Sequence, residues 1–194
     1  MIDLKEIADK LELQYNVVCE VGVFAPNSSH IRNLIPNSKK VIMIEAQKEH
    51  ADAIKMAFNH YDYVEVHNVA IYKENLDKIK LYCKNEAAFI EGIASPETVI
   101  MNYAPNENHA FYVTARTFDN YDDGDIDILT VDIEGAEWYV IEKLKSRPKI
   151  ICLETHYKPP IYINPHMDDI EKWMVEYNYE KYCEDVSDTV YIRK

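Results

Sequence analysis

The stretch that most constrains the fold is a short apolar run followed by a glycine turn. Residues 17–21 form a nearly continuous apolar run, as in a strand that is buried on both faces of a parallel sheet. Glu20 lies near the end of this run, and Gly22 follows where the chain must turn, with no Cβ to keep its backbone away from a ligand. Residues 27–29 are all N-cap types, which predicts a helix that begins near Ser28 and directs its free N–H groups at the same crevice. In open α/β sheets, ligands bind in the crevice outside the carboxyl ends of the strands.

A second buried-strand run, residues 40–45, also ends in an acid, Glu45. In nucleotide-binding βαβ units, an acid roughly 20 residues after the glycine turn accepts hydrogen bonds from ribose hydroxyls. A carboxylate suits that role because its two oxygens can accept from two vicinal hydroxyls at once. The alternative is an acid that is simply solvated at the end of its strand. Because Glu20 and Glu45 both lie at strand ends, the pattern favours a nucleotide-like ligand.

Composition and charge narrow the class of protein. A chain of 194 residues has the length of one domain, and its formal net charge of −13 repels phosphate backbones and anionic membrane surfaces. We therefore expect neither nucleic acid nor a membrane as a partner. The four cysteines (19, 83, 152 and 183) include no CxxC pair, which is typical of buried free thiols in a reducing compartment. With no signal peptide and no long apolar run, we expect a cytoplasmic protein.

The periodicity of apolar residues predicts alternating strands and helices, a pattern typical of a parallel sheet with right-handed crossovers. The order is β-α-β-α-β up to residue 71, and a terminal hairpin is predicted over residues 179–192. We expect a single domain over residues 1–194. The other predicted helices span residues 3–14, 49–59, 135–145 and 167–177, and the predicted strands span residues 17–21, 40–45, 63–71, 77–83, 111–118, 126–132 and 150–156.

A long connection follows the strand predicted at residues 77–83, whose strict alternation is typical of an edge strand. Residues 85–110 lose periodicity and contain one glycine and two prolines. A connection of this length inside a domain is usually a lid or binding loop, or else disordered. Apolar anchors such as Phe89 and Ile90 favour a lid over the substrate.

Polar residues follow the predicted strands 126–132 and 150–156, at the edge where Gly22 also lies. They are Asp132, Glu134, Glu154 and His156. Three carboxylates and an imidazole at one edge suit removal of a proton from a substrate hydroxyl, or binding of a hard divalent cation. The structural alternatives are that Glu134 and Glu137 stabilise a helix N-terminus and that His156 is a hydrogen-bonded loop residue. We take Asp132, Glu134 and His156 as the catalytic candidates.

The turn after residue 22 lacks the glycines of a dinucleotide site, because Phe24 and residues 25–27 stand there instead. Binding of a pyrophosphate depends on those glycines. A cofactor that has a ribose but no phosphates is therefore favoured.

Six segments complete the pattern when they are read in order. They are Glu20-Val-Gly22 with residues 27–29, Ile44-Glu45-Ala46, residues 68–71, residues 117–121, residues 126–137 and residues 153–156. In this order they resemble the motifs of the S-adenosylmethionine-dependent FkbM-type methyltransferases. The most specific part is Asp132-Ile-Glu134-Gly-Ala-Glu137.

This resemblance implies a Rossmann-like three-layer α/β sandwich, with a mostly parallel seven-stranded sheet whose last strand is antiparallel. It also implies methyl transfer from S-adenosylmethionine to a hydroxyl of a small-molecule acceptor, a sugar or another metabolite. By position, Glu20 and Gly22 would hold the methionine end of the cofactor, Glu45 the ribose, residues 68–70 the adenine and Asp132 the sulfonium. The residues expected to bind the cofactor are Glu20, Gly22, Phe24, Asn27, Ser28, Ser29, Glu45, Ala46, Asn68, Val69, Ala70 and Asp132.

Two positions depart from the family pattern. Glu20 stands where an aspartate is usual, and Pro26 stands where the first loop usually has its second glycine. Because proline fixes φ and removes an N–H donor, the alternative to an enzyme is a non-catalytic cofactor-binding module, or a partner subunit with the same fold. A metal-dependent hydrolase that uses the acid cluster has no nucleophile motif behind it and is the least supported reading.

Overall fold

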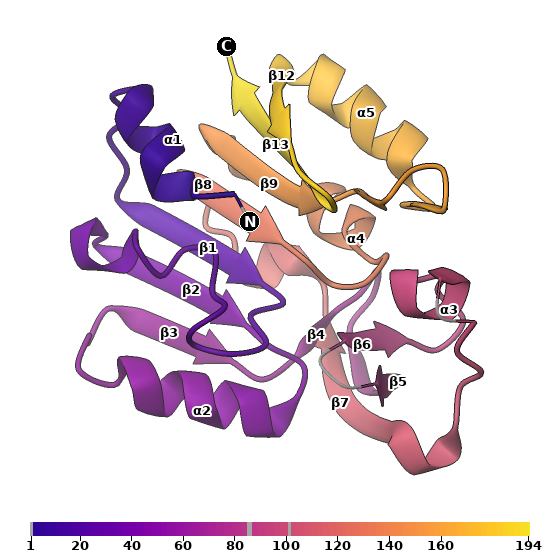
Figure 1. The fold of residues 1–194 in the computed structure, drawn as a ribbon. Helices are drawn as coiled ribbons and strands as arrows, with labels where there is room; N and C mark the ends of the chain where they lie inside the picture. Colours follow the sequence, from indigo (N-terminus) through magenta and orange to yellow (C-terminus); the bar gives the residue numbers. More distant parts are fainter. Residues whose placement is uncertain (1, 85–86, 101) are drawn as a thin grey trace.

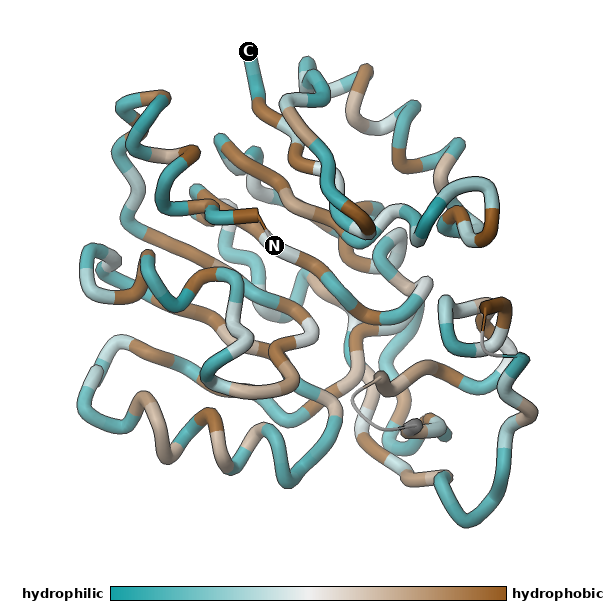
Figure 2. Tube along the Cα trace, viewed as in Figure 1, coloured by the Kyte–Doolittle hydropathy of each residue, from teal (hydrophilic) through white to brown (hydrophobic). Residues whose placement is uncertain are grey.

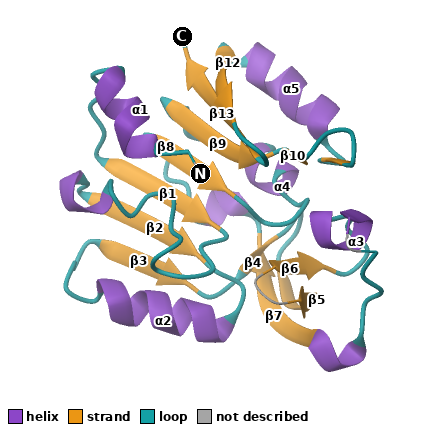
Figure 3. Cartoon of the chain, in the orientation of Figure 1, coloured by secondary structure: helices purple, strands orange, loops and turns teal. Residues whose placement is uncertain are grey.

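The computed structural model describes residues 2–84, 87–100 and 102–194, and a seven-stranded main sheet forms its centre (Figure 1). The apolar runs of the sequence form the middle of this sheet (Figure 3). The strands are β1 (Val17–Val21), β2 (Lys40–Ile44), β3 (Val64–His67), β8 (Ile128–Val131), β9 (Ile150–Glu154), β12 (Tyr179–Glu184) and β13 (Asp188–Arg193). Their order across the sheet is β12-β13-β9-β8-β1-β2-β3.

Strands β1, β2, β3, β8 and β9 run parallel to one another, and the last strand, β13, runs antiparallel to β9 and β12. The predicted fold class and the terminal hairpin are thus confirmed. Val21, at the end of β1, lies beside Ile44 of β2 and Val131 of β8. Because these strands end level, the loops that follow them leave from one edge of the sheet.

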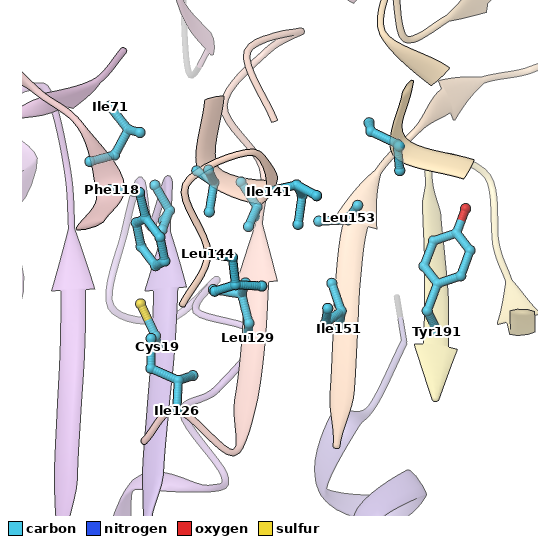
Figure 4. Packing of buried hydrophobic residues seen from close by; sticks show 14 of the residues in the cluster. Cys19, Ile71, Phe118, Ile126, Leu129, Ile141, Leu144, Ile151, Leu153 and Tyr191 are labelled. Atoms are coloured by element: carbon cyan, nitrogen blue, oxygen red, sulfur yellow. The ribbon is translucent and has the colours of Figure 1, made fainter. Parts of the chain in front are cut away.

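Helices cover both faces of the main sheet, as a three-layer sandwich requires. Helices α1 (Leu4–Lys10), η1 (Ile35–Asn37) and α2 (Lys48–Phe58) pack on the face that carries Val18 and Met43. Helices η3 (Phe118–Asn120), α4 (Trp138–Ile141) and α5 (Met167–Glu176) cover the opposite face, where Cys19, Leu129 and Ile151 point (Figure 4). Figure 2 shows that the central strands carry the longest hydrophobic stretches. No helix in the described ranges has the length and hydropathy needed to cross a bilayer.

A second, four-stranded sheet lies beyond the carboxyl edge of the main sheet (Figure 1). It contains β4 (Ala70–Ile71), β5 (Leu76–Lys84), β6 (Ala87–Ile90) and β7 (Ala110–Arg116), in the order β4-β7-β5-β6. We call it the small sheet. Ala70, Leu81 and Ile90 form its apolar side together with Ala136 from the loop after β8.

Two strand predictions need correction in this region. The strand predicted over residues 63–71 divides into β3 in the main sheet and β4 in the small sheet. Asn68 lies at the division, and its Nδ2 donates to the carbonyl oxygens of Glu45 (2.9 Å) and Ala46 (2.8 Å), which fixes the chain where it changes sheets. The strand predicted at residues 77–83 is confirmed as β5, but it is not an edge strand, because it lies between β7 and β6.

The connection predicted over residues 85–110 contains regular structure. Residues 85–86 and 101 lie outside the described residues, and the others include β6, α3 (Pro96–Ile100) and η2 (Glu107–His109). Similarly, the residues after β9 contain a two-stranded hairpin of β10 (His156–Tyr157) and β11 (Tyr162–Ile163). The role of the first segment as a lid stays a prediction.

Three helix predictions also need correction. The helix predicted over residues 3–14 is α1, which ends at Lys10 because Glu12 has a φ of +51°, outside the helical region. Residues 26–28 and 30–34 form turns, so within the described chain no helix begins at Ser28. The helix predicted over residues 135–145 is reduced to the four residues of α4. It starts late because Gly135 has a φ of +95°, outside the helical region. It ends early because the N–H groups of Lys143 and Leu144 bond to carbonyls three residues back, in tighter turns.

Candidate functional site

A cavity of about 790 Å³ lies between the carboxyl edge of the main sheet and the small sheet. Gly22, Glu45 and Asp132 line it from the ends of β1, β2 and β8. Leu81 and Ile90 line it from the small sheet. This edge is where open α/β sheets bind ligands, and the volume falls within the range of about 300–1,000 Å³ found for small-molecule sites.

Gly22 holds two walls of the cavity together. Its N–H donates to the carbonyl of Ile44, and the N–H of Asp132 donates to the carbonyl of Val21, each at 2.9 Å. A Cβ on residue 22 would lie 1.7 Å from the Asp132 carbonyl oxygen, and the φ of Gly22 is +86°. The close approach that requires glycine is therefore to the backbone of β8, and not only to a ligand.

Glu20 fastens the loop that follows Gly22 and does not line the cavity. Its side chain is 2% exposed. One carboxylate oxygen accepts from the Ser29 hydroxyl at 2.5 Å, and the other accepts from the His30 N–H at 2.8 Å. Burial raises the pKa of Glu20 to about 7, although these hydrogen bonds act in the opposite direction.

The same loop accommodates Pro26 without a missing hydrogen bond. The N–H of Ser28 donates to the carbonyl of Ala25 at 3.0 Å, so Pro26 takes the second position of a turn, where no N–H is required. Ser28 lines the cavity, whereas Asn27 is exposed and does not. Phe24 also lines the cavity. Its φ is +54°, a backbone conformation that residues other than glycine rarely adopt.

Glu45 is buried at the end of β2 and faces the cavity. One of its carboxylate oxygens accepts from the N–H of Phe24 (2.9 Å), and the other accepts from the N–H of Gln47 (2.7 Å). A carboxylate oxygen has two lone pairs, so each oxygen keeps one acceptor position for a ligand. Its neighbour Ala46 also lines the cavity.

Three carboxylates gather at the wall of the cavity beside the ends of β8 and β9. Asp132 and Glu134 line it, and Glu154, at the end of β9, lies behind them with 8% of its surface exposed. One oxygen of each lies within 4.8 Å of the others. Burial, followed by repulsion from neighbouring carboxylates, raises the pKa of all three groups.

Glu137 shapes the loop that carries these acids. It is fully buried, and one of its oxygens accepts from the N–H groups of Ile133 (2.9 Å) and Gly135 (3.2 Å). Its other oxygen accepts from the side-chain amide of Asn164. Burial raises the pKa of Glu137, against the effect of the backbone hydrogen bonds. Glu137 thus acts as a hydrogen-bond acceptor for its own loop and not as the charge at a helix N-terminus.

His156 does not line the cavity. Its Nδ1 lies 2.8 Å from the hydroxyl of Thr155, and its Nε2 lies 3.1 Å from the carbonyl oxygen of Asp185. Both ring nitrogens are therefore engaged within the protein. This geometry favours the structural alternative for His156, a hydrogen-bonded loop residue.

The structure brings most of the predicted site residues to one cavity. Those that line it are Gly22, Phe24, Ser28, Glu45, Ala46, Val69, Ala70, Asp132 and Glu134. Those that do not are Glu20, Asn27, Ser29, Asn68 and His156. Five of the lining residues that sequence reasoning missed come from the small sheet, because no local pattern shows that this sheet folds over the edge of the other; they are Ile71, Leu81, Ala87, Ala88 and Ile90.

Comparison with known proteins agrees with this architecture. The family model of the methyltransferase FkbM domain matches residues 14–181. No curated protein matches the chain. A candidate RNA methyltransferase from Pyrococcus horikoshii superimposes with a TM-score of 0.51 and 12% identity, over 96% of this chain and 76% of that one. A candidate methylase from Haemophilus influenzae superimposes with a TM-score of 0.50 and 14% identity, over 100% of this chain and 88% of that one. At these identities the structural similarity shows a shared fold.

Proposed function

We propose, since this chain belongs to the family of FkbM methyltransferase domains, that it transfers the methyl group of S-adenosylmethionine to a hydroxyl of a sugar or another small metabolite. The observation that carries this proposal is the cavity into which Gly22, Glu45 and Asp132 converge from three adjacent parallel strands. Family membership supports methyl transfer, and the chemistry of the cavity supports the cofactor and the class of acceptor.

The lining of the cavity fits an adenosyl cofactor that carries a positive charge. Ile44, Val69 and Ile71 offer apolar surface for a purine. Glu45 has acceptor positions left for ribose hydroxyls, and the carboxylates of Asp132 and Glu134 would stabilise a cationic sulfur. When bound, S-adenosylmethionine supplies a methyl group that is activated by its sulfonium.

The acids of the cavity also restrict the acceptor. Glu45, Asp132 and Glu134 accept hydrogen bonds from hydroxyl groups and repel phosphates and carboxylates. A neutral molecule with several hydroxyls therefore fits this lining better than an anionic one. This property supports a sugar or a similar metabolite as the acceptor.

Asp132 and Glu134 are the candidates for the general base. Burial and the neighbouring carboxylates raise the pKa of both groups, which makes each a stronger base when it is ionised. As the hydroxyl oxygen forms its bond to the methyl carbon and the bond from that carbon to sulfur breaks, the hydroxyl proton passes to the carboxylate. Because His156 lies outside the cavity, we no longer propose it as the base.

Calorimetric titration of the full chain with S-adenosylmethionine and S-adenosylhomocysteine tests the proposal. We expect both to bind at one site, and Glu45→Gln to weaken binding at least about tenfold through lost ribose contacts. Glu65→Gln, which removes an exposed acid outside the cavity, is the matched control. Mass spectrometry of a panel of neutral polyols then tests methyl transfer. Binding without transfer to any acceptor would favour the non-catalytic module, and binding of neither compound would contradict both readings.

A further inference from the structure

The three clustered carboxylates beside the cavity come from separate parts of the fold. Asp132 follows β8, Glu134 lies in the turn after it, and Glu154 ends the neighbouring strand β9. One oxygen from each lies within 4.8 Å of the other two. Such a gathering of negative charge in a buried place calls for positive charge or for hydrogen-bond donors.

Two carboxylate oxygens of these residues have no hydrogen-bond donor among the described residues. Oε2 of Glu154 and Oε2 of Glu134 are both buried and have no hydrogen-bond partner there. Glu154 is the more telling of the two, because more than nine-tenths of its surface is buried. By contrast, both oxygens of Glu137, in the same loop, accept hydrogen bonds. Unlike Glu137, the cluster therefore has buried carboxylate oxygens without a partner among the described residues, where a bound cation would satisfy them.

We propose that Asp132, Glu134 and Glu154 bind a hard divalent cation of the Mg²⁺, Mn²⁺ or Ca²⁺ class. All three ligands are carboxylate oxygens, which such cations prefer. Two oxygens that bind one cation at about 2.1–2.6 Å can lie at most about 5.2 Å apart. One oxygen from each of the three carboxylates lies within 4.8 Å of the others, which is close enough for all three to share a cation.

The position of the cluster indicates what the cation would do. Asp132 and Glu134 line the cavity and Glu154 lies behind them, so the protein ligands occupy one side of the site and leave the side toward the cavity open. This part of the inference rests on the proposed function. A hydroxyl oxygen of the acceptor could take an open position, where the cation lowers the pKa of that hydroxyl. The proton then leaves to a cavity carboxylate or to water, the oxygen forms its bond to the methyl carbon, and the bond from that carbon to sulfur breaks.

Titration with Mn²⁺ alone tests the site without any methyl transfer. The full chain, freed of metal with a chelator, is titrated without S-adenosylmethionine or acceptor, and free Mn²⁺ is followed by electron paramagnetic resonance. We expect one Mn²⁺ per chain with a dissociation constant below about 1 mM. Glu154→Gln and Glu134→Gln should each weaken binding at least tenfold. Glu134 lies in a turn and is partly exposed, so its variant keeps the test open if Glu154→Gln does not fold.

The matched control is Glu45→Gln, which lines the same cavity outside the cluster. It should bind Mn²⁺ within about twofold of the original chain while it loses affinity for S-adenosylmethionine, and Glu154→Gln should do the reverse. The metal site would be overturned if the unsubstituted chain binds no Mn²⁺. It would also be overturned if Glu154→Gln and Glu134→Gln both bind Mn²⁺ as well as the unsubstituted chain does. Mn²⁺ binding without binding of S-adenosylmethionine would support the metal site and contradict the proposed function.

Discussion

Gly22 lies so close to Asp132 that a Cβ on residue 22 would be 1.7 Å from the Asp132 carbonyl oxygen. In the sequence, the glycine suggests a close approach to a ligand. In the structure, it lets the ends of β1 and β8 pack together at the wall of the cavity. The same residue is thus needed for the fold, whatever the cavity binds.

Replacing Gly22 by alanine should destabilise the protein strongly. The added methyl group overlaps a backbone atom, which cannot rotate away, and the φ of +86° is strained for any residue with a side chain. We expect the free energy of unfolding to fall by about 3 kcal/mol or more, as measured by urea denaturation.

Gly124→Ala is the matched control for that substitution. Gly124 has a similar φ of +93°, but nothing lies within 4 Å of its added Cβ. It should therefore lose only the backbone contribution of about 1–2 kcal/mol. Equal losses at residues 22 and 124 would show that the contact with Asp132 is unimportant.

The main sheet could be predicted because buried parallel strands require continuous apolar runs. Residues 17–21 and 40–44 are such runs, and helices α2 and α5 differ from their predicted bounds by one residue at most at either end. The acids of the site could also be predicted, since parallel strands that end level bring Glu45 and Asp132 to one edge.

The small sheet could not be predicted in the same way. Strand β4 has two residues and pairs with β7, far along the chain, so no local periodicity marks it. The roles of Glu20 and His156 were equally hidden, because alternation shows which face of a strand a side chain occupies and not what covers it. Glu20 is covered by Ser29 and His30, and His156 by Asp185.

The hydrogen bond between Glu137 and Asn164 should stabilise the loop after β8, and exchanging the acid and the amide of this pair tests it. Glu137→Gln places an amide N–H₂ group opposite either backbone donors or the donor of Asn164. We expect a loss of about 2–3 kcal/mol in the free energy of unfolding. In the double variant with Asn164→Asp, the new amide can donate to the new carboxylate, which still can accept from the N–H of His166. The double variant should recover at least half of the loss, and a further decrease would contradict this account.

Phe24 should show the reverse of the usual preference for alanine over glycine. At its φ of +54°, Phe24→Gly relieves backbone strain that Phe24→Ala retains, and both variants lose the ring contact with His50. The glycine variant should be more stable by about 1 kcal/mol in urea denaturation. The control pair is at Phe58, the last residue of helix α2, where alanine should be the more stable of the two, by less than the roughly 1 kcal/mol of a helix interior. The same order at both sites would exclude strain at Phe24.

Glu20 should make stability depend on pH. Its pKa is about 7 in the folded chain against an ordinary value of 4.5, so between these values the folded chain binds more protons than the unfolded chain. The free energy of unfolding therefore falls as the pH rises through this window, by up to about 3 kcal/mol for this group. Other buried acids make the free energy of unfolding depend on pH in the same direction. The pH dependence of the unsubstituted chain is therefore compared with that of Glu20→Gln, both in the presence of a chelator. Urea midpoints between pH 5 and 8 should fall less steeply in the variant, and equal slopes would contradict the shift.

Two substitutions, one inside the cavity and one outside it, distinguish Asp132 from His156 as the general base. Asp132→Asn removes a carboxylate that lines the cavity, whereas His156→Ala removes an imidazole that does not. If Asp132 takes the hydroxyl proton, kcat for a neutral acceptor should fall by about 10²-fold or more in the first variant. In the second, kcat should stay within about threefold once the folded fraction is measured by circular dichroism. Because loss of a cation ligand would also lower kcat, Mn²⁺ affinity is measured in parallel. A large fall in His156→Ala with its fold intact would return the imidazole to the reaction.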